Sequence, residues 1–201
     1  MKTFPMFLQM AGRLVVIAGG GEQAAQKARL MLKTEARLRL IAPVLDPELA
    51  GLVASGRAEQ VAEASQEAFA GAALVFIATG DAARDLALHA MAKAAGCLVN
   101  VVDRPELCDA VTPSIVDRAP VVVAIGTEGT APVLGRQIKT QIEQLLEPNL
   151  GGLAALAGRL RSAVAQSVPH ARRRALWAWV LAGPVRDAHA RGRERDAASL
   201  L

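Results

Sequence analysis

A short apolar run that meets three consecutive glycines constrains the fold of this chain more than any other feature. Residues 14–24 have the sequence LVVIAGGGEQA. Gly19, Gly21 and Ala24 fit the G-x-G-x-x-G/A spacing of dinucleotide-binding folds, in which the first glycine makes a tight turn and the second lets the backbone approach a pyrophosphate. The alternative is an ordinary strand-to-helix turn, but the position of these glycines at the start of an alternating chain favours a nucleotide site.

Apolar runs alternate with alanine-rich segments over most of the chain. Buried strands are predicted at residues 14–18, 38–42, 74–78, 98–102 and 121–125, with a weaker strand at 58–63. Helices are predicted at residues 22–32, 47–55, 82–95 and 131–146, with Asp81 and Thr130 as N-caps of the last two. This alternation indicates an α/β fold with a Rossmann-type doubly wound parallel sheet.

A region of different character follows residue 147. Residues 147–152, EPNLGG, have the turn composition of a domain boundary, and three helices without strands are predicted beyond it, at 153–168, 171–181 and 184–198. We therefore expect a nucleotide-binding domain at residues 1–147 and a helical region at 148–201. This helical region carries more apolar surface than so small an appendage can bury on itself, which predicts a homodimer and one wall of a substrate cleft.

The hydropathy and charge of the chain predict where the protein is located and what it binds. No apolar run approaches the roughly 20 residues of a membrane helix, and the first residues lack a secretory signal pattern, so a cytoplasmic protein without membrane contact is expected. Nine Arg and three acidic residues follow position 150, which gives that segment a formal charge of +6. Because it has no nucleic-acid recognition motif, a solvated helix face is favoured over nucleic-acid binding.

The cysteines and histidines predict neither a disulfide nor a bound metal. Cys97 and Cys108 lack C-x-x-C spacing, and the three histidines are scattered without a partner at ligand spacing. We therefore expect two buried thiols and no permanent metal site.

The sequence lacks the catalytic motifs of several common enzyme classes. The chain has no tyrosine, so a Tyr-x-x-x-Lys proton relay cannot form, and it has neither a P-loop nor a G-x-S-x-G motif. The remaining candidates follow the later predicted strands: Asn100 and Asp103 in NVVD, and residues 126–130 in GTEGT. Asp103 is a candidate base, with a loop-capping carboxylate as the alternative. The GTEGT loop suits a carboxylate or phosphate, with a helix cap as the alternative.

Longer segments of the chain resemble one family. They are FPMFLQMAGRLVVIAGGG at residues 4–21, AAQKAR at 24–29, CLVNVVD at 97–103, CDAVTPSIVDRAPVVVAIGTEGTAPVLGR at 108–136 and ARRRALW at 171–177. In these segments the chain resembles precorrin-2 dehydrogenase, the N-terminal module of siroheme synthase, which also occurs as a stand-alone protein. The resemblance covers nearly the whole length and is far more specific than the glycines alone.

The resemblance implies a reaction and a set of residues. It implies NAD-dependent oxidation of precorrin-2 to sirohydrochlorin and, in bifunctional members, insertion of ferrous iron as a second substrate to give siroheme. It implies that Asp103 is the acid/base residue. The implied cofactor contacts are Gly19, Gly21, Glu22, Gln23, Pro43, Val44 and Asn100. The implied contacts to the tetrapyrrole substrate are Ser114, Arg118, Thr127, Gly129, Thr130 and Arg136, with Arg172, Arg173 and Arg174 as further electrostatic partners.

The chain also departs from the family pattern. The acidic residue usual for the adenosine ribose is missing after the second predicted strand, LIAPVLD, so the preference for NAD rests on the resemblance. Thr127 occupies a position that is a phosphorylated serine in some members, and Ala131 replaces a serine that is common before Pro132. No methyltransferase domain follows Leu201, so a separate uroporphyrinogen methyltransferase is expected to supply precorrin-2.

Three interpretations stay open. The chain is a dehydrogenase that also inserts iron, a dehydrogenase alone, or a non-catalytic sensor of NAD or a tetrapyrrole that keeps the fold. Retention of Asp103 within NVVD favours an enzyme.

Overall fold

The chain folds into two compact units. The computed structural model describes residues 1–200, except the side chains of residues 194 and 198, and divides the chain into Met1–Thr112 and Pro113–Leu201. The boundary predicted at 147/148 lies inside the second unit, between helices α5 (Pro132–Leu145) and α6 (Leu150–Ser167). The division into domains 1–147 and 148–201 stays a prediction, and residue 201 lies outside the described residues.

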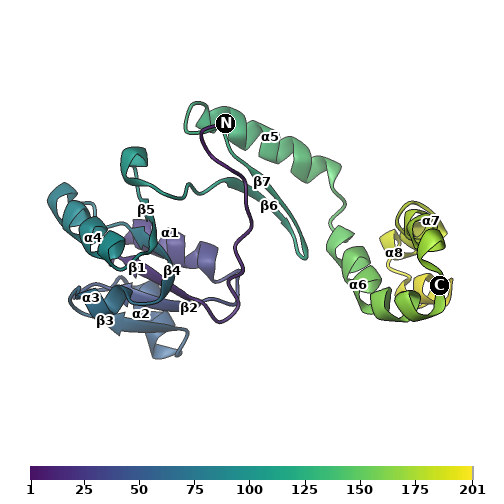
Figure 1. Ribbon diagram of the computed structural model, residues 1–201, viewed down its shortest axis with the longest axis horizontal. Coiled ribbons are helices and arrows are strands. Elements are labelled where there is room, and N and C mark those ends of the chain that lie inside the picture. Colours follow the sequence, from purple (N-terminus) through teal and green to yellow (C-terminus); the bar gives the residue numbers. More distant parts are fainter. Residues whose placement is uncertain (201) are drawn as a thin grey trace. The chain divides into compact units, whose positions relative to one another are not determined.

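The first unit is built on a five-stranded sheet in the order β3-β2-β1-β4-β5 (Figure 1). All four pairings are parallel, which confirms the predicted Rossmann-type doubly wound sheet. The strands are β1 (Leu14–Ala18), β2 (Arg37–Ile41), β3 (Ala58–Val61), β4 (Ala72–Ile77) and β5 (Leu98–Val101). The helices are α1 (Glu22–Met31), α2 (Pro47–Ala54), α3 (Gln66–Phe69) and α4 (Ala82–Ala94), with a 3₁₀ turn, η1, at Pro105–Leu107.

Strand β1 lies in the middle of this sheet and is buried along its whole length. Successive side chains of a strand point to opposite faces. Val15 and Ile17 pack in the cluster that contains the alanines of α1, whereas Val16 and Ala18 pack in the cluster that contains Leu88 of α4. Helices therefore cover both faces, which explains why the strand is a continuous apolar run instead of an alternating one.

The two predicted helix caps have different outcomes. Asp81 is confirmed as the N-cap of α4, since its carboxylate accepts hydrogen bonds from the backbone N–H groups of Ala83 and Arg84. The prediction for Thr130 is wrong, because the N-cap of α5 is Ala131. The Thr130 hydroxyl instead donates back to the carbonyl of Thr127 at 2.6 Å, within the preceding loop.

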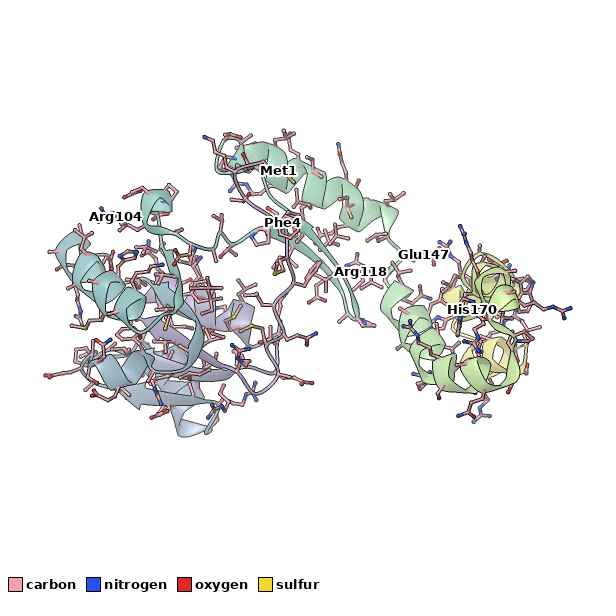
Figure 2. All side chains as sticks on the ribbon, viewed as in Figure 1. Met1, Phe4, Arg104, Arg118, Glu147 and His170 are labelled. Atoms are coloured by element: carbon pink, nitrogen blue, oxygen red, sulfur yellow. The ribbon has the colours of Figure 1, made fainter. Side chains whose placement is uncertain are left out.

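The second unit begins with an antiparallel hairpin of β6 (Ser114–Arg118) and β7 (Val121–Ile125). The prediction that residues 121–125 belong to the parallel sheet is therefore wrong. Only residues 119 and 120 separate the two strands, and a two-residue connection permits an antiparallel pair, whereas parallel neighbours need a long crossover. Figure 2 shows Arg118 at the turn end of this hairpin.

Helices complete the second unit. After α5 and α6 come α7 (His170–Ala182), α8 (Pro184–Ala190) and α9 (Glu194–Ser199). The third predicted helix, 184–198, is thus two short helices, separated where Gly192 adopts a φ of 72°. Leu156, Val180 and Val185 are buried in the small core that these helices share. Among the described residues, no helix is both long and apolar enough to span a membrane.

Two glycines of α6 provide a matched test of this packing. A Cβ at Gly151 would overlap the carbonyl oxygens of Arg118 and Ala119, whereas a Cβ at Gly158 would meet nothing within 4 Å. We expect Gly151→Ala to lower the free energy of unfolding by about 1–3 kcal/mol, because either the hairpin turn or the helix must move. Gly158→Ala should raise it by up to about 1 kcal/mol through helix propensity. Chemical denaturation measures both, and equal effects would contradict the close approach at Gly151.

Candidate functional site

The turn between β1 and α1 brings three backbone segments into close contact. A Cβ at Gly19 would overlap the carbonyl oxygen of Ala78, which follows β4, and a Cβ at Gly20 would overlap that of Val44, which follows β2. Gly19 also has a φ of 142°, a conformation that side chains oppose. A Cβ at Gly21 would meet nothing within 4 Å, so that position is open to solvent or a ligand.

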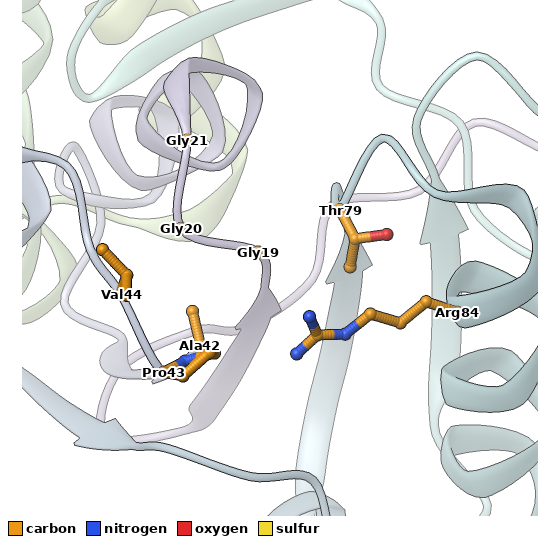
Figure 3. A pocket seen from close by; sticks show the side chains of 8 residues that line it. All are labelled: Gly19, Gly20, Gly21, Ala42, Pro43, Val44, Thr79 and Arg84. Atoms are coloured by element: carbon orange, nitrogen blue, oxygen red, sulfur yellow. The ribbon is translucent and has the colours of Figure 1, made fainter.

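A pocket lies over this turn (Figure 3). Its volume is about 190 Å³, and it opens where β1, β2 and β4 end. In an open parallel sheet, ligands bind beyond the carboxyl ends of the strands at the point where the strand order reverses. The N-cap of α1 is Gly21, which has no side chain to cap the helix, so the first N–H groups of α1 are available to an anion. The lining residues are Gly19, Gly20, Gly21, Ala42, Pro43, Val44, Thr79 and Arg84.

The acidic residues near the turn are engaged with other protein groups. Glu22 and Glu48 both pair with Arg29, at 2.9 and 2.6 Å. The Asp46 carboxylate caps α2 by accepting from the N–H groups of Glu48 and Leu49. None of these three carboxylates lines the pocket.

Asp103 lies just beyond the end of β5. Its side chain is exposed and its backbone has a φ of 59°, a left-handed conformation that is uncommon outside glycine. One carboxylate oxygen, Oδ2, accepts a hydrogen bond from Nε2 of Gln23 at 3.3 Å. Gln23 is in the first turn of α1, so this bond joins Asp103 to the helix that starts at the glycine turn.

Lys27, one turn further along α1, is a charged neighbour of Asp103. Its ammonium lies over the ring of Phe76, 5.5 Å from the centroid, and is half-buried. Burial lowers the pKa of Lys27 because it disfavours the charged form, while the charges of Asp103 and Cys108 oppose that decrease.

The side chains of Asn100 and the two cysteines are buried or half-buried against other protein groups. The Asn100 side chain is buried, and its amide donates to the carbonyl of Ala110 at 2.8 Å. Both cysteines are free thiols: Cys97 is buried and Cys108 is half-buried, and burial raises the pKa of each. In the part of the chain that the structure describes, no cluster of three or more His, Cys, Asp or Glu could hold a metal ion.

The GTEGT loop of the second unit connects β7 to α5. Glu128 and Gly129 both have positive φ, at 50° and 76°, and make a tight turn. A Cβ at Gly135 of α5 would lie 3.3 Å from Cγ2 of Thr127 and 3.6 Å from Oγ of Ser114. The two hydroxyl-bearing residues, Ser114 and Thr127, therefore lie close to the same helical glycine.

The arginines predicted to bind substrate have different environments. Arg118 donates to the carbonyls of Asp117 and Glu143, both at 3.1 Å, and its Nε is buried without a partner among the described residues. Arg173 donates to the carbonyls of Ala165 and Val168 at the end of α6. These contacts favour structural roles for Arg118 and Arg173, whereas Arg136, Arg172 and Arg174 are exposed.

The predicted cofactor residues are only partly brought together. Four of them line the pocket: Gly19, Gly21, Pro43 and Val44. Glu22, Gln23 and Asn100 do not, and Arg84 and Lys27 were missed by sequence reasoning. The position of Arg84 in the first turn of the helix after β4 is a signal that could have identified it. Asp103 and the predicted substrate residues belong to different units, and the roles of all these residues stay predictions.

Comparison with protein families agrees with this geometry. Residues 6–114, more than half of the chain, match a family model described as "Putative NAD(P)-binding". The chain belongs to this NAD(P)-binding family. The matched segment contains the glycine turn, the pocket and Asp103, and residues 149–201 match a second model, described as the sirohaem synthase dimerisation region.

Similar proteins extend the comparison over nearly the whole chain. Siroheme synthases of Methylobacillus flagellatus, Stutzerimonas stutzeri and Chromobacterium violaceum are 41%, 39% and 40% identical over 98–100% of this chain. This NAD(P)-binding chain spans only 42–44% of the length of these relatives. The resemblance to siroheme synthase is confirmed by these matches.

A solved structure has the same fold. It is named "SirC, precorrin-2 dehydrogenase", and its TM-score is 0.73 at 19% identity, covering 98% of each chain. At this identity the likeness concerns the fold, including the helical region.

The coupling between Lys27 and Asp103 has a measurable consequence. Asp103 raises the pKa of Lys27 against the effect of burial, so Asp103→Asn should lower the pKa of Lys27 further. NMR titration of the Lys27 side chain, assigned with Lys27→Arg, measures this change. Glu106→Gln is the control, because Glu106 pairs with Arg104 and does not act on Lys27. An unchanged pKa in Asp103→Asn would contradict the coupling.

Proposed function

We propose that this chain oxidises precorrin-2 to sirohydrochlorin with NAD as hydride acceptor, a step of siroheme biosynthesis. The observation that carries the proposal is Asp103, an exposed carboxylate held in a left-handed backbone conformation beyond β5 and hydrogen-bonded to the helix of the glycine turn. Sequence similarity to siroheme synthases over the whole chain supports the choice of substrate.

The turn and pocket fit a dinucleotide. The backbone of Gly19, Gly20 and Gly21 carries no side chain that would exclude a pyrophosphate, and the uncapped start of α1 supplies N–H groups for it. Pro43 and Val44 are the proposed contacts at the adenosine end. Glu22, Gln23 and Asn100 are retained as proposed contacts from the family resemblance.

The proposed reaction separates a hydride from a proton. NAD, when bound, accepts the hydride. Asp103 accepts the proton that leaves the substrate, and its exposure lets the proton pass on to solvent. Gln23 orients the carboxylate through its hydrogen bond to Oδ2, which leaves the other oxygen, Oδ1, for the proton.

The substrate carries several carboxylates, for which the second unit offers suitable partners. We propose that Ser114, Thr127, Gly129 and Thr130 bind a carboxylate through hydroxyl and backbone N–H groups. Arg136, Arg172 and Arg174 are the proposed electrostatic partners, because they are exposed. Arg118 stays a proposed contact from the resemblance, with a structural role as the alternative, since its guanidinium donates to two backbone carbonyls.

Insertion of ferrous iron is a second candidate activity of the same site. Metallation removes two pyrrole N–H protons, and the exposed Asp103 is a proton acceptor for that step too. The tetrapyrrole supplies the metal ligands, so the reaction needs no metal site built from the protein.

The test is anaerobic absorbance with precorrin-2 and NAD, followed by ferrous iron. We expect NADH and sirohydrochlorin with the unchanged chain, and a decrease of about 10²–10⁴-fold in rate with Asp103→Ala, with dinucleotide affinity retained. Glu106→Gln, which changes an exposed carboxylate three residues away, should keep the rate. Dinucleotide binding without turnover would favour a sensor, and an unfolded Asp103→Ala would favour a structural carboxylate.

We also propose that the chain is a homodimer. Trp179 of α7 is 43% exposed although it is large and apolar, and it lies in the region that matches the dimerisation model. At micromolar concentration, light scattering should give twice the 21.0 kDa mass of the chain. Trp179→Glu should shift the mass toward the monomer, whereas Leu86→Glu, at a position 47% exposed on α4, should not. A monomeric wild-type protein would contradict the proposal.

A further inference from the structure

The pocket over the glycine turn contains a cation and no carboxylate. Its only charged lining residue is Arg84, whose side chain extends from the first turn of α4 toward the pocket in Figure 3. Among the described side chains, the guanidinium of Arg84 has no hydrogen-bond or ion-pair partner. A free planar cation of this kind is suited to bind a phosphate through two parallel hydrogen bonds.

The acidic residues adjacent to Arg84 bind other groups. The Asp81 carboxylate caps α4 by binding two backbone N–H groups. Asp85 is 5% exposed and accepts a hydrogen bond from the hydroxyl of Thr79 at 2.5 Å. Neither carboxylate forms an ion pair with Arg84, so the N–H donors of the guanidinium are available to a ligand.

The position of the pocket indicates which part of a dinucleotide meets Arg84. Ala42, Pro43 and Val44, which follow β2, line the same pocket. In this fold the adenosine ribose lies beside that loop; an acidic residue there binds the 2′-hydroxyl of NAD, and a nearby arginine accommodates the 2′-phosphate of NADP. Here the acidic residue is missing from the lining, and Asp46, which follows, is the cap of α2.

We propose that Arg84 binds the 2′-phosphate of NADP, so that the pocket accepts NADP as well as NAD. The inference rests on the proposed dinucleotide site but not on the proposed oxidation. Arg84 determines which dinucleotide binds at the adenosine end. It takes no part in the proton transfer proposed for Asp103.

Calorimetric titration of the full chain with NAD and with NADP, at low salt, tests the inference. We expect the Kd for NADP to be equal to or lower than that for NAD. Arg84→Gln should raise the Kd for NADP about tenfold and that for NAD less than twofold, since only NADP loses a charged contact. Arg84→Lys should retain part of the preference, because it keeps the charge and loses the planar geometry.

Arg57→Gln is the matched control. Arg57 is also exposed in the first unit, but it precedes β3 and therefore lies at the opposite end of the strands from the pocket. Its loss should leave both Kd values unchanged, which separates a local contact from an effect of net charge.

Three other binding results would contradict the role of Arg84. NADP binding tenfold weaker than NAD binding in the wild type would overturn the inference while leaving the NAD site intact. Equal weakening of both ligands in Arg84→Gln would overturn it in favour of a contact that NAD and NADP share, with the pyrophosphate or with the adenine ring. Binding of neither ligand would reject the inference together with the proposed dinucleotide site.

Discussion

The close approach of the glycine turn to its neighbours is the constraint on which the nucleotide-binding unit depends. Gly19 and Gly20 lie against the backbone carbonyls of Ala78 and Val44, at the ends of two other strands. Side chains at these positions would separate the three segments that line the pocket. The buried strand β1 makes this approach possible, because its pairing with β2 and β4 fixes all three strand ends at one edge of the sheet.

The second unit is organised around a similar constraint. Gly151, in the first turn of α6, lies against the carbonyls of Arg118 and Ala119 in the turn of the β6–β7 hairpin. The guanidinium of Arg118 binds the carbonyl of Glu143 near the end of α5. The hairpin turn is therefore held by two helices.

The sequence could predict most of the first unit but less of its pocket. Continuous apolar runs identified four of the five parallel strands because helices cover both faces of the sheet. The run at 121–125 looks the same, and only the two-residue connection before it distinguishes a hairpin strand. The remaining parallel strand, β3, has the sequence AEQV with two exposed residues and gave only a weak signal. Arg84 and Lys27 were missed because their roles depend on which way a helix faces. The glycine spacing located the turn, because only glycine lets the backbone approach the neighbouring carbonyls so closely, and glycines are visible in the sequence.

One backbone hydrogen bond gives the pocket a mechanical property. The N–H of Asp46 donates to the carbonyl of Gly20 at 2.8 Å, while the carboxylate of the same residue caps α2. The wall of the pocket formed by residues 42–44 is thereby fastened both to the glycine turn and to a helix. A shift of that wall would break the hydrogen bond to the glycine turn or carry α2 with it. On the opposite side of the pocket, the exposed side chain at position 84 of α4 can change without disturbing the glycine turn, so selectivity at the adenosine end can evolve there by single substitutions.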